Sequence, residues 1–359
     1  MSGVNQHYLP QFLMRGFATR GGTLKSPVYK AVEHHKSRGV MSARNIKSIG
    51  AQRNFYGKEG PGSTDEAIDR LEGTLAPVIC RLNLGESLSG DDIPQIASLG
   101  AHLLIRVKHM RSIMEDGFRE MGGLMRSYAK DGRLFERGAQ QIDDVELERM
   151  IAEEAAKRRI TFTSEQTRLF KNLARAEIQR KKSDPIFKKE LAEILESAAD
   201  RFDQEAIERS EQAHLKALGK GLDPAPLVAA FQQLTWSVAH FPGEMLILPD
   251  VPIVAFSADG NGMRAIMHKD DPPALVALPI STERALMGSS VEGWLPTADD
   301  INRVGAEFAH EFFIAEGVTG ATRALVASIG TAPSIFDDPE WATVKQEALE
   351  GKSAKPGSV

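Results

Sequence analysis

The 359-residue chain contains a single cysteine, Cys80, and only 6% of its residues are aromatic. One cysteine excludes an intrachain disulfide framework and a cysteine-rich zinc site. No run of about 18 or more apolar residues occurs, and the first residues lack the basic-then-apolar pattern of a secretory signal. We therefore expect a soluble protein of the cytoplasm that has no membrane partner.

The common signatures of nucleotide-binding and hydrolytic enzymes are also missing. The sequence has no Walker loop, no glycine-rich dinucleotide turn after a strand, no His-Glu-x-x-His and no Gly-x-Ser-x-Gly. These absences argue against the most widespread mechanisms, but they exclude no reaction class, because other residue sets perform the same chemistry.

Charge is distributed unevenly along the chain. Residues 1–58 hold ten Lys/Arg and one acid, Glu33, whereas the remaining 301 residues hold 34 Lys/Arg and 48 Asp/Glu. The net charges are +9 and −14, which together give the overall −5. This asymmetry indicates either an anion-binding module on an acidic body or a basic segment that docks onto that body.

Local patterns predict an α+β fold in several parts. Residues 1–129 form a basic, irregular-to-β segment and then core helices, with helix caps at Ser63, Thr64 or Asp65 and at Ser89 or Asp91. Residues 130–217 are highly charged and predict a helical insertion or arm. Residues 218–351 predict an antiparallel sheet of roughly four to six strands that packs with 1–129, a closing helix over 297–317 capped by Thr297, and a last strand over 321–330. Residues 352–359 are expected to be a disordered tail.

The charged region includes Arg168–Lys189, which has eight Lys/Arg and two acids. This composition is typical of a solvated helix face, and a second anion-binding surface is the alternative. The arm could also mediate oligomerisation.

The stretch "QHYLPQFLMRGFA" (Gln6–Ala18) raises the question of a site. His7 can act as an acid or base near neutral pH, and Arg15 can bind a phosphate or carboxylate through two hydrogen bonds. In a straight strand these residues would lie roughly 26 Å apart, too far for one site. A short helix beginning at Pro10 would instead place Gln11 and Arg15 one turn apart. In the alternative, His7 and Arg15 have structural partners only.

Other polar residues stand in apolar or charged surroundings. Adjacent His34 and His35 predict an exposed turn, with metal ligation as the alternative. A long helix would place His102 and His109 on one face, with Arg106 between them, either lining a pocket or at the helix edge. Asp250, between two prolines, either caps a turn or belongs to a site.

Several of these pieces together resemble a bacterial family known only as domain of unknown function 4238. The resemblance rests on "HYLPQFLMRGFA", "RNFYG" (Arg53–Gly57), "DEAIDRLEGTLAPVI", "ILPDVPIVAF" and "ALPIS", in this order. Two departures are Met14, where the family has leucine, and Pro249, where it has serine. The resemblance implies no activity, and it marks the positions His7, Pro10, Arg15, Phe17, Phe55, Tyr56, Asp250 and Pro252.

Two functional hypotheses follow. In the first, the protein is an effector of hydrolase or nuclease type that acts on nucleic acid or another phosphate-bearing ligand, with a divalent metal as a candidate cofactor. His7 would be the acid or base, and Asp250 would ligate the metal or orient His7. The ligand would be bound by Gln11, Arg15, Arg53, Tyr56 and Arg106. In the second, the protein is a non-catalytic binding or regulatory module whose basic segment docks a partner.

Overall fold

The computed structural model describes residues 5–23, 25–40, 42–57, 60, 62–130, 144–157, 160–182, 184–264, 273–291, 293–337 and 339–349. The chain forms two compact units, one from residues 1–114 with 211–332 and the other from 115–210 with 333–359. The boundaries at residues 130, 218 and 352 stay predictions from the sequence pattern. The predicted tail, 352–359, lies outside the described residues.

The strands of the first unit pair in an antiparallel manner. A five-stranded sheet has the order β10 (Gly262–Met263), β9 (Val254–Phe256), β11 (Leu275–Ser281), β12 (Arg284–Ser289) and β7 (Thr235–His240). This sheet has the strand number and direction that the sequence predicted, and β11 is a continuous buried apolar run. The α+β class is therefore confirmed.

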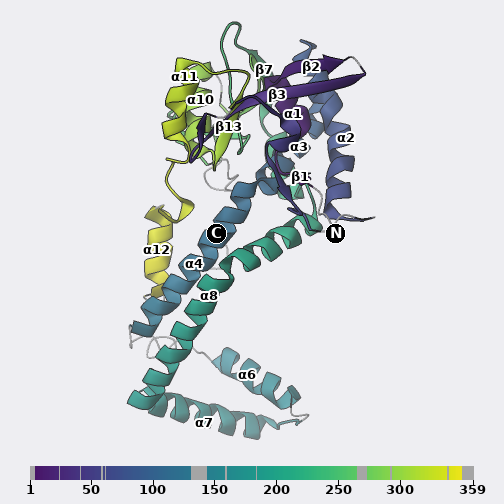
Figure 1. The fold of residues 1–359 in the computed structure, drawn as a ribbon. Coiled ribbons are helices and arrows are strands. Elements are labelled where there is room, and N and C mark those ends of the chain that lie inside the picture. The colour runs from purple at the N-terminus through teal and green to yellow at the C-terminus, as the bar shows by residue number, and fades with distance from the viewer. Residues whose placement is uncertain are drawn as a thin grey trace. The chain divides into compact units, whose positions relative to one another are not determined.

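A second sheet is built around the ten-residue strand β3 (Ser26–His35). Its order is β2 (Thr19–Thr23), β3, β13 (Phe312–Ala315) and β8 (Leu248–Pro249), and β4 (Gly39–Val40) and β5 (Arg44–Asn45) also pair with β3. β2 pairs with residues 26–30 of β3, whereas β13 pairs with residues 32–35. One end of β3 is thus part of the core, and the other forms a hairpin with β2 (Figure 1). A separate pair joins β1 (Asn5–His7) to β6 (Ala51–Arg53).

Side-chain caps fix the starts of the helices, as the sequence predicted. Ser63 accepts a hydrogen bond from the Glu66 amide at the start of α2 (Thr64–Asn83), and α10 (Ala298–Phe308) begins with a capping box from Thr297. Ser89 caps the turn before α3 (Ile93–Arg106), which packs against α9 (Ala225–Gln232).

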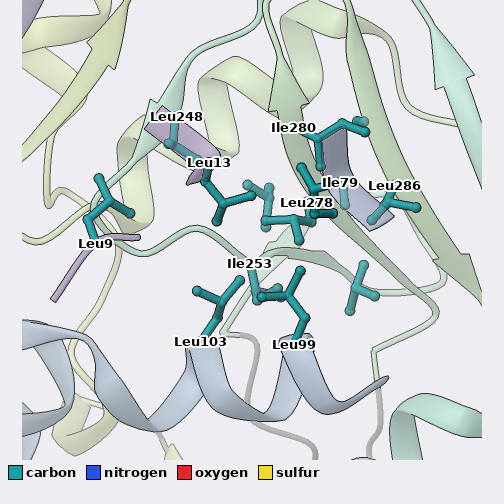
Figure 2. Packing of buried hydrophobic residues seen from close by; sticks show 14 of the residues in the cluster. Leu9, Leu13, Ile79, Leu99, Leu103, Leu248, Ile253, Leu278, Ile280 and Leu286 are labelled. Atoms are coloured by element: carbon teal, nitrogen blue, oxygen red, sulfur yellow. The ribbon is translucent and has the colours of Figure 1, made fainter. Parts of the chain in front are cut away.

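The core of this unit draws on distant segments. Figure 2 shows Leu9 and Leu13 from the N-terminal motif, Leu99 and Leu103 from α3, and Leu278 from β11 in one cluster. All five are at most 2% exposed. At about 25 cal/mol per Å² of buried apolar area, this packing dominates the stabilisation of the unit. The apolar residues of the motif are therefore core residues.

Three predictions about elements were wrong. The long helix expected to hold His102 and His109 is broken, because Val107 is extended (φ −68°, ψ 152°) between α3 and α4 (Lys108–Lys130). The two histidines therefore do not share one helix face. The closing helix ends at Phe308, because the following residues form β13 against β3. The predicted last strand over 321–330 is α11 (Gly320–Leu325) and a 3₁₀ turn, since Thr319 caps a helix there.

The second unit is helical. It contains α6 (Asp144–Lys157), α7 (Ser164–Lys182), most of α8 (Pro185–Lys220), α12 (Pro339–Leu349) and the larger part of α4. Ion pairs link its helices, as between Arg126 and Asp203 (2.5 Å) and between Lys345 and Glu120 (2.7 Å). Among the described helices of the whole chain, none combines the length and apolarity needed to cross a membrane.

Candidate functional site

The N-terminal motif is a strand that turns into a short helix, as its spacing predicted. β1 ends at His7, and α1 (Gln11–Met14) follows Pro10 and continues into a 3₁₀ turn over Arg15–Phe17. The amide of Tyr8 donates to the carbonyl of Gly50 (2.9 Å), which fixes the bend between strand and helix. Proline favours this place because its fixed φ suits a helix start.

His7 lies at the end of this strand with its ring partly buried. The Gln11 amide nitrogen lies 3.4 Å from Nδ1, so Nδ1 accepts and the ring proton belongs on Nε2. Nε2 is buried without a hydrogen-bond partner among the described residues. Burial lowers the pKa of His7, although the backbone of Lys47 opposes the shift. His7 is therefore a neutral imidazole at pH 7.

Arg106 connects the motif to the helices around it. Its side chain is 1% exposed and donates to Glu72 on α2, to His102 Nε2 (3.0 Å), to the hydroxyl of Tyr56 (3.3 Å) and to the carbonyl of His7. Both Arg106 and Tyr56 are buried and bonded within the protein, so in this structure neither faces solvent as a ligand-binding group.

Asp250 lies in a turn that follows β8. Its buried carboxylate accepts hydrogen bonds from the backbone amides of His310 (2.7 Å), Glu311 (2.8 Å) and Phe312 (3.4 Å). Burial raises the pKa of Asp250 to about 7, although these amide donors favour the charged form. The carboxylate thus caps the loop between α10 and β13, which is the turn-capping alternative. Among the described residues, no hydrogen bond or ion pair joins Asp250 to His7.

The two predicted arginines outside this cluster are exposed. The guanidinium of Arg15 lies over the ring of Tyr29, with Cζ 5.7 Å from the centroid, and Arg53 lies in β6 opposite Asn5. The structure therefore brings His7, Gln11, Tyr56 and Arg106 together and leaves Arg15, Arg53 and Asp250 outside this group.

Three exposed cations, Arg20, Lys25 and Lys30, lie on the hairpin of β2 and β3, and Arg15 lies in the 3₁₀ turn just before it. We call the exposed residues Arg15, Arg20, Lys25 and Lys30 the basic ribbon. Arg20 lies opposite Tyr29 on the partner strand, and Lys30 lies opposite Thr19. Because neighbouring residues of a strand point to opposite faces, Arg20 and Lys30 lie on different faces of the hairpin. The ribbon thus carries positive charge on both faces.

The single acid of the basic segment is used elsewhere. Glu33 is 2% exposed and pairs with Arg38 and Arg44, each at 2.6 Å. No ion pair within the described part of the chain involves a residue of the basic ribbon. Among the described residues, the ion pairs of the basic segment are therefore those that Arg38 and Arg44 form with Glu33, its own acid.

His34 and His35 are not in an exposed turn, and that prediction was wrong. They lie in β3, where His34 stacks on Phe313 (4.7 Å) and His35 on Phe312 (6.4 Å) across the pair with β13. Within the described residues, no group of three or more His, Cys, Asp or Glu side chains could hold a metal ion.

Sequence reasoning selected His109 but missed Glu72 and Arg264, the residue that contacts His109. The guanidinium of Arg264 lies 3.0 Å from His109 Nε2, across 155 positions of sequence. No spacing rule detects such a pair, because only the tertiary fold brings the two residues together.

The geometry defines an α+β protein with a buried polar cluster at its N-terminal motif and a basic ribbon beside it. A family model described as "Protein of unknown function (DUF4238)" matches residues 5–312, and the chain belongs to this family. No curated protein and no solved structure gave a significant match.

Proposed function

We propose that this protein binds duplex nucleic acid through the basic ribbon. The observation that carries the proposal is an exposed hairpin with three cations and a fourth, Arg15, just before it; among the described residues none of the four has an acidic partner. Cations on both of its faces suit a groove with phosphates on both walls, and a two-stranded ribbon is narrow enough to enter the major groove of a duplex. This is the binding alternative of the sequence analysis, with the partner specified as nucleic acid.

The salt dependence of binding tests the proposal. If four cations each displace a counterion, log K falls with log salt at a slope of about −3.6. Fluorescence anisotropy with a labelled duplex of about 20 base pairs would measure this slope. The double variant Arg20→Gln/Lys30→Gln should weaken binding and make the slope less steep by about 2.

A control variant with the same change in net charge distinguishes an effect of the basic ribbon from an effect of the total charge of the protein. Arg70 on α2 and Lys220 at the end of α8 are exposed cations outside the ribbon. The variant Arg70→Gln/Lys220→Gln should keep the affinity and slope of the wild type. Equal losses in both double variants, or no binding by the wild type at low salt, would rule out a specific role for the ribbon.

Hydrolysis of the bound nucleic acid is a second, separate proposal. It is favoured by His7, a partly buried imidazole beside Gln11 whose pKa is lowered by burial. Incubation of a labelled duplex with the protein, with and without Mg²⁺, tests for cleavage and for the candidate metal. Loss of cleavage with retained binding in His7→Ala would support the proposal, and absence of cleavage in the wild type would refute it.

Two further expectations have their own tests. A cytoplasmic location can be examined by cell fractionation. Assembly through the charged helices, in which Glu148 pairs with Lys171 (2.5 Å) and Glu177 with Arg180 (2.7 Å), can be examined by sedimentation velocity.

A further inference from the structure

Helix α7 of the second unit exposes three large apolar side chains close together. Leu169, Phe170 and Leu173 are 57%, 40% and 55% exposed. Single exposed apolar residues are normal on a protein surface, but three within five positions of one helix form a continuous patch. We call Leu169, Phe170 and Leu173 the α7 patch.

The two leucines of the α7 patch face away from the neighbouring helix. α7 packs against α6 (Figure 1), and Lys171 of α7 pairs with Glu148 of α6 at 2.5 Å. Successive residues of an α-helix are turned by about 100°, so Leu169 and Leu173 each lie about 200° from Lys171 around the helix axis. The patch is therefore on the outer side of the pair of helices.

The spacing of residues on this outer side is that of a coiled-coil seam. Leu173 follows Leu169 by four residues, and the exposed residues Ala176 and Arg180 follow at further intervals of three and four. Alternating intervals of three and four residues keep side chains on the side of a helix that faces a partner helix. The outer side of α7 is therefore suited to pack against another helix.

The exposed charges near the two ends of α7 have opposite signs. Glu165 lies eight residues before Leu173, and Arg180 lies seven residues after it. At about 1.5 Å per residue, these separations along the helix are about 12 Å and 11 Å. A second α7 that runs antiparallel and is centred on Leu173 would thus place Glu165 of each copy beside Arg180 of the other. A parallel second α7 would instead place like charges beside each other, which is unfavourable.

We propose that α7 is the contact surface of a symmetric dimer, in which the α7 patches of two copies of this chain pack antiparallel across a two-fold axis near Leu173. A two-fold interface joins the same surface on both subunits, so that surface must be complementary to itself. The apolar centre of α7, with opposite charges at nearly equal distances from it, has this property. The dimer gives a contact surface to the assembly expected of the charged helices. It is independent of duplex binding, because no residue of the basic ribbon lies in α7.

Sedimentation velocity of the full chain, at protein concentrations from about 1 to 100 μM, tests the proposal. We expect the mass to rise from that of the monomer towards twice that value. Leu169→Glu/Leu173→Glu should raise the dissociation constant at least about tenfold, because it places carboxylates at the apolar centre of the interface. Glutamate forms helices about as well as leucine, so α7 itself should persist. The matched control is Ile186→Glu/Ile194→Glu, which makes the same charge change at exposed positions of α8 and should dimerise like the wild type.

A charge swap tests the antiparallel arrangement. Glu165→Arg or Arg180→Glu alone should weaken the dimer about threefold or more, because like charges then meet near both ends of the interface. Glu165→Arg/Arg180→Glu should bind more tightly than Arg180→Glu, because the pairs between the copies form again with reversed signs. Arg180 also pairs with Glu177 of its own helix (2.7 Å), and the two variants being compared both lack this pair.

The same measurements can overturn the proposal. It fails if the wild type stays monomeric at every concentration, if the leucine variant dimerises like the wild type, or if the swapped variant is no tighter than Arg180→Glu. Circular dichroism verifies the helix content of each variant. Arg20→Gln/Lys30→Gln should dimerise like the wild type, so failure of duplex binding would leave the dimer result unchanged.

Discussion

The guanidinium of Arg106 on α3 donates to the carboxylate of Glu72 on α2, although the arginine side chain is only 1% exposed. Glu72 supplies a negative charge for a cation that would otherwise be buried alone. Removing one partner of a buried ion pair costs far more than the pair itself contributes, because the other charge stays desolvated.

We therefore expect Glu72→Gln to lower the free energy of unfolding by about 3 kcal/mol. Urea unfolding followed by circular dichroism would measure the change. Arg70→Gln is the matched control, because Arg70 forms an exposed pair with Glu66 (3.4 Å) on the same helix and should contribute at most about 0.5 kcal/mol. If both variants lose a similar amount of unfolding free energy, the pair of Arg106 and Glu72 contributes no more than the exposed pair.

The raised pKa of Asp250 should make the stability of the protein depend on pH. Burial raises its pKa in the folded protein to about 7 from an ordinary value of 3.8, so the folded state binds this proton more tightly than the unfolded chain does. Its contribution to stability is fully present below about pH 4 and is lost as the pH rises to about 7. The free energy of unfolding of the wild type minus that of Asp250→Asn should fall by about 2–3 kcal/mol between about pH 5 and pH 7.5.

Asp92 provides a control of the opposite sign. Burial opposes ionisation there, but hydrogen bonds from Arg81 and Ser89 outweigh it and lower the pKa of Asp92. Its stabilisation is present above its ordinary pKa and is lost only as the pH falls through the lowered value. The difference between the wild type and Asp92→Asn should therefore be constant from about pH 5 to pH 7.5. A constant difference for Asp250→Asn as well would contradict the raised pKa.

Local chemistry explains which parts of the fold were predictable. The caps at Ser63 and Thr297 and the short helix after Pro10 depend on residues within one turn, and the sequence predicted each of them. The break at Val107 was not predictable, because the apolar stripe continues through it and no Gly or Pro marks it. The helix capped by Thr319 did carry a local signal, since Thr319 and Thr322 cap each other three residues apart.

The candidate site was predictable only in part. His7, Gln11 and Arg106 were selected and lie together, but Glu72, the half-buried carboxylate that pairs with Arg106, was missed. Asp250 was recognised as a costly carboxylate, and its donors lie about 60 positions away in a loop that sequence spacing cannot place beside it. Local propensity identifies helix starts, whereas long-range pairs require the tertiary fold.

The fold leaves no space for a side chain at position 16, so Gly16 should not tolerate substitution. A Cβ atom built on it would lie 2.1 Å from the carbonyl oxygen of Ile280 and 2.9 Å from the Cα of Ser281, both backbone atoms of β11. Because backbone cannot rotate away, we expect Gly16→Ala to destabilise the protein by about 3 kcal/mol. Gly73→Ala on α2 meets no atom within 4 Å and should stabilise it by up to about 1 kcal/mol. If the denaturant midpoints of Gly16→Ala and Gly73→Ala shift in the same direction, this prediction is refuted.

The geometry of the basic ribbon depends on Gly22. Its φ of +76° lies in the left-handed region, and a Cβ atom there would lie 2.5 Å from the carbonyl oxygen of Ser26. Gly22→Ala should strain the hairpin by about 1–2 kcal/mol, lower the melting temperature by only a few degrees and weaken duplex binding about fivefold or more. Gly21→Ala, whose Cβ would lie 3.8 Å from its nearest neighbour, should bind like the wild type. Unchanged anisotropy titrations for Gly22→Ala would show that binding does not require the ribbon in this conformation.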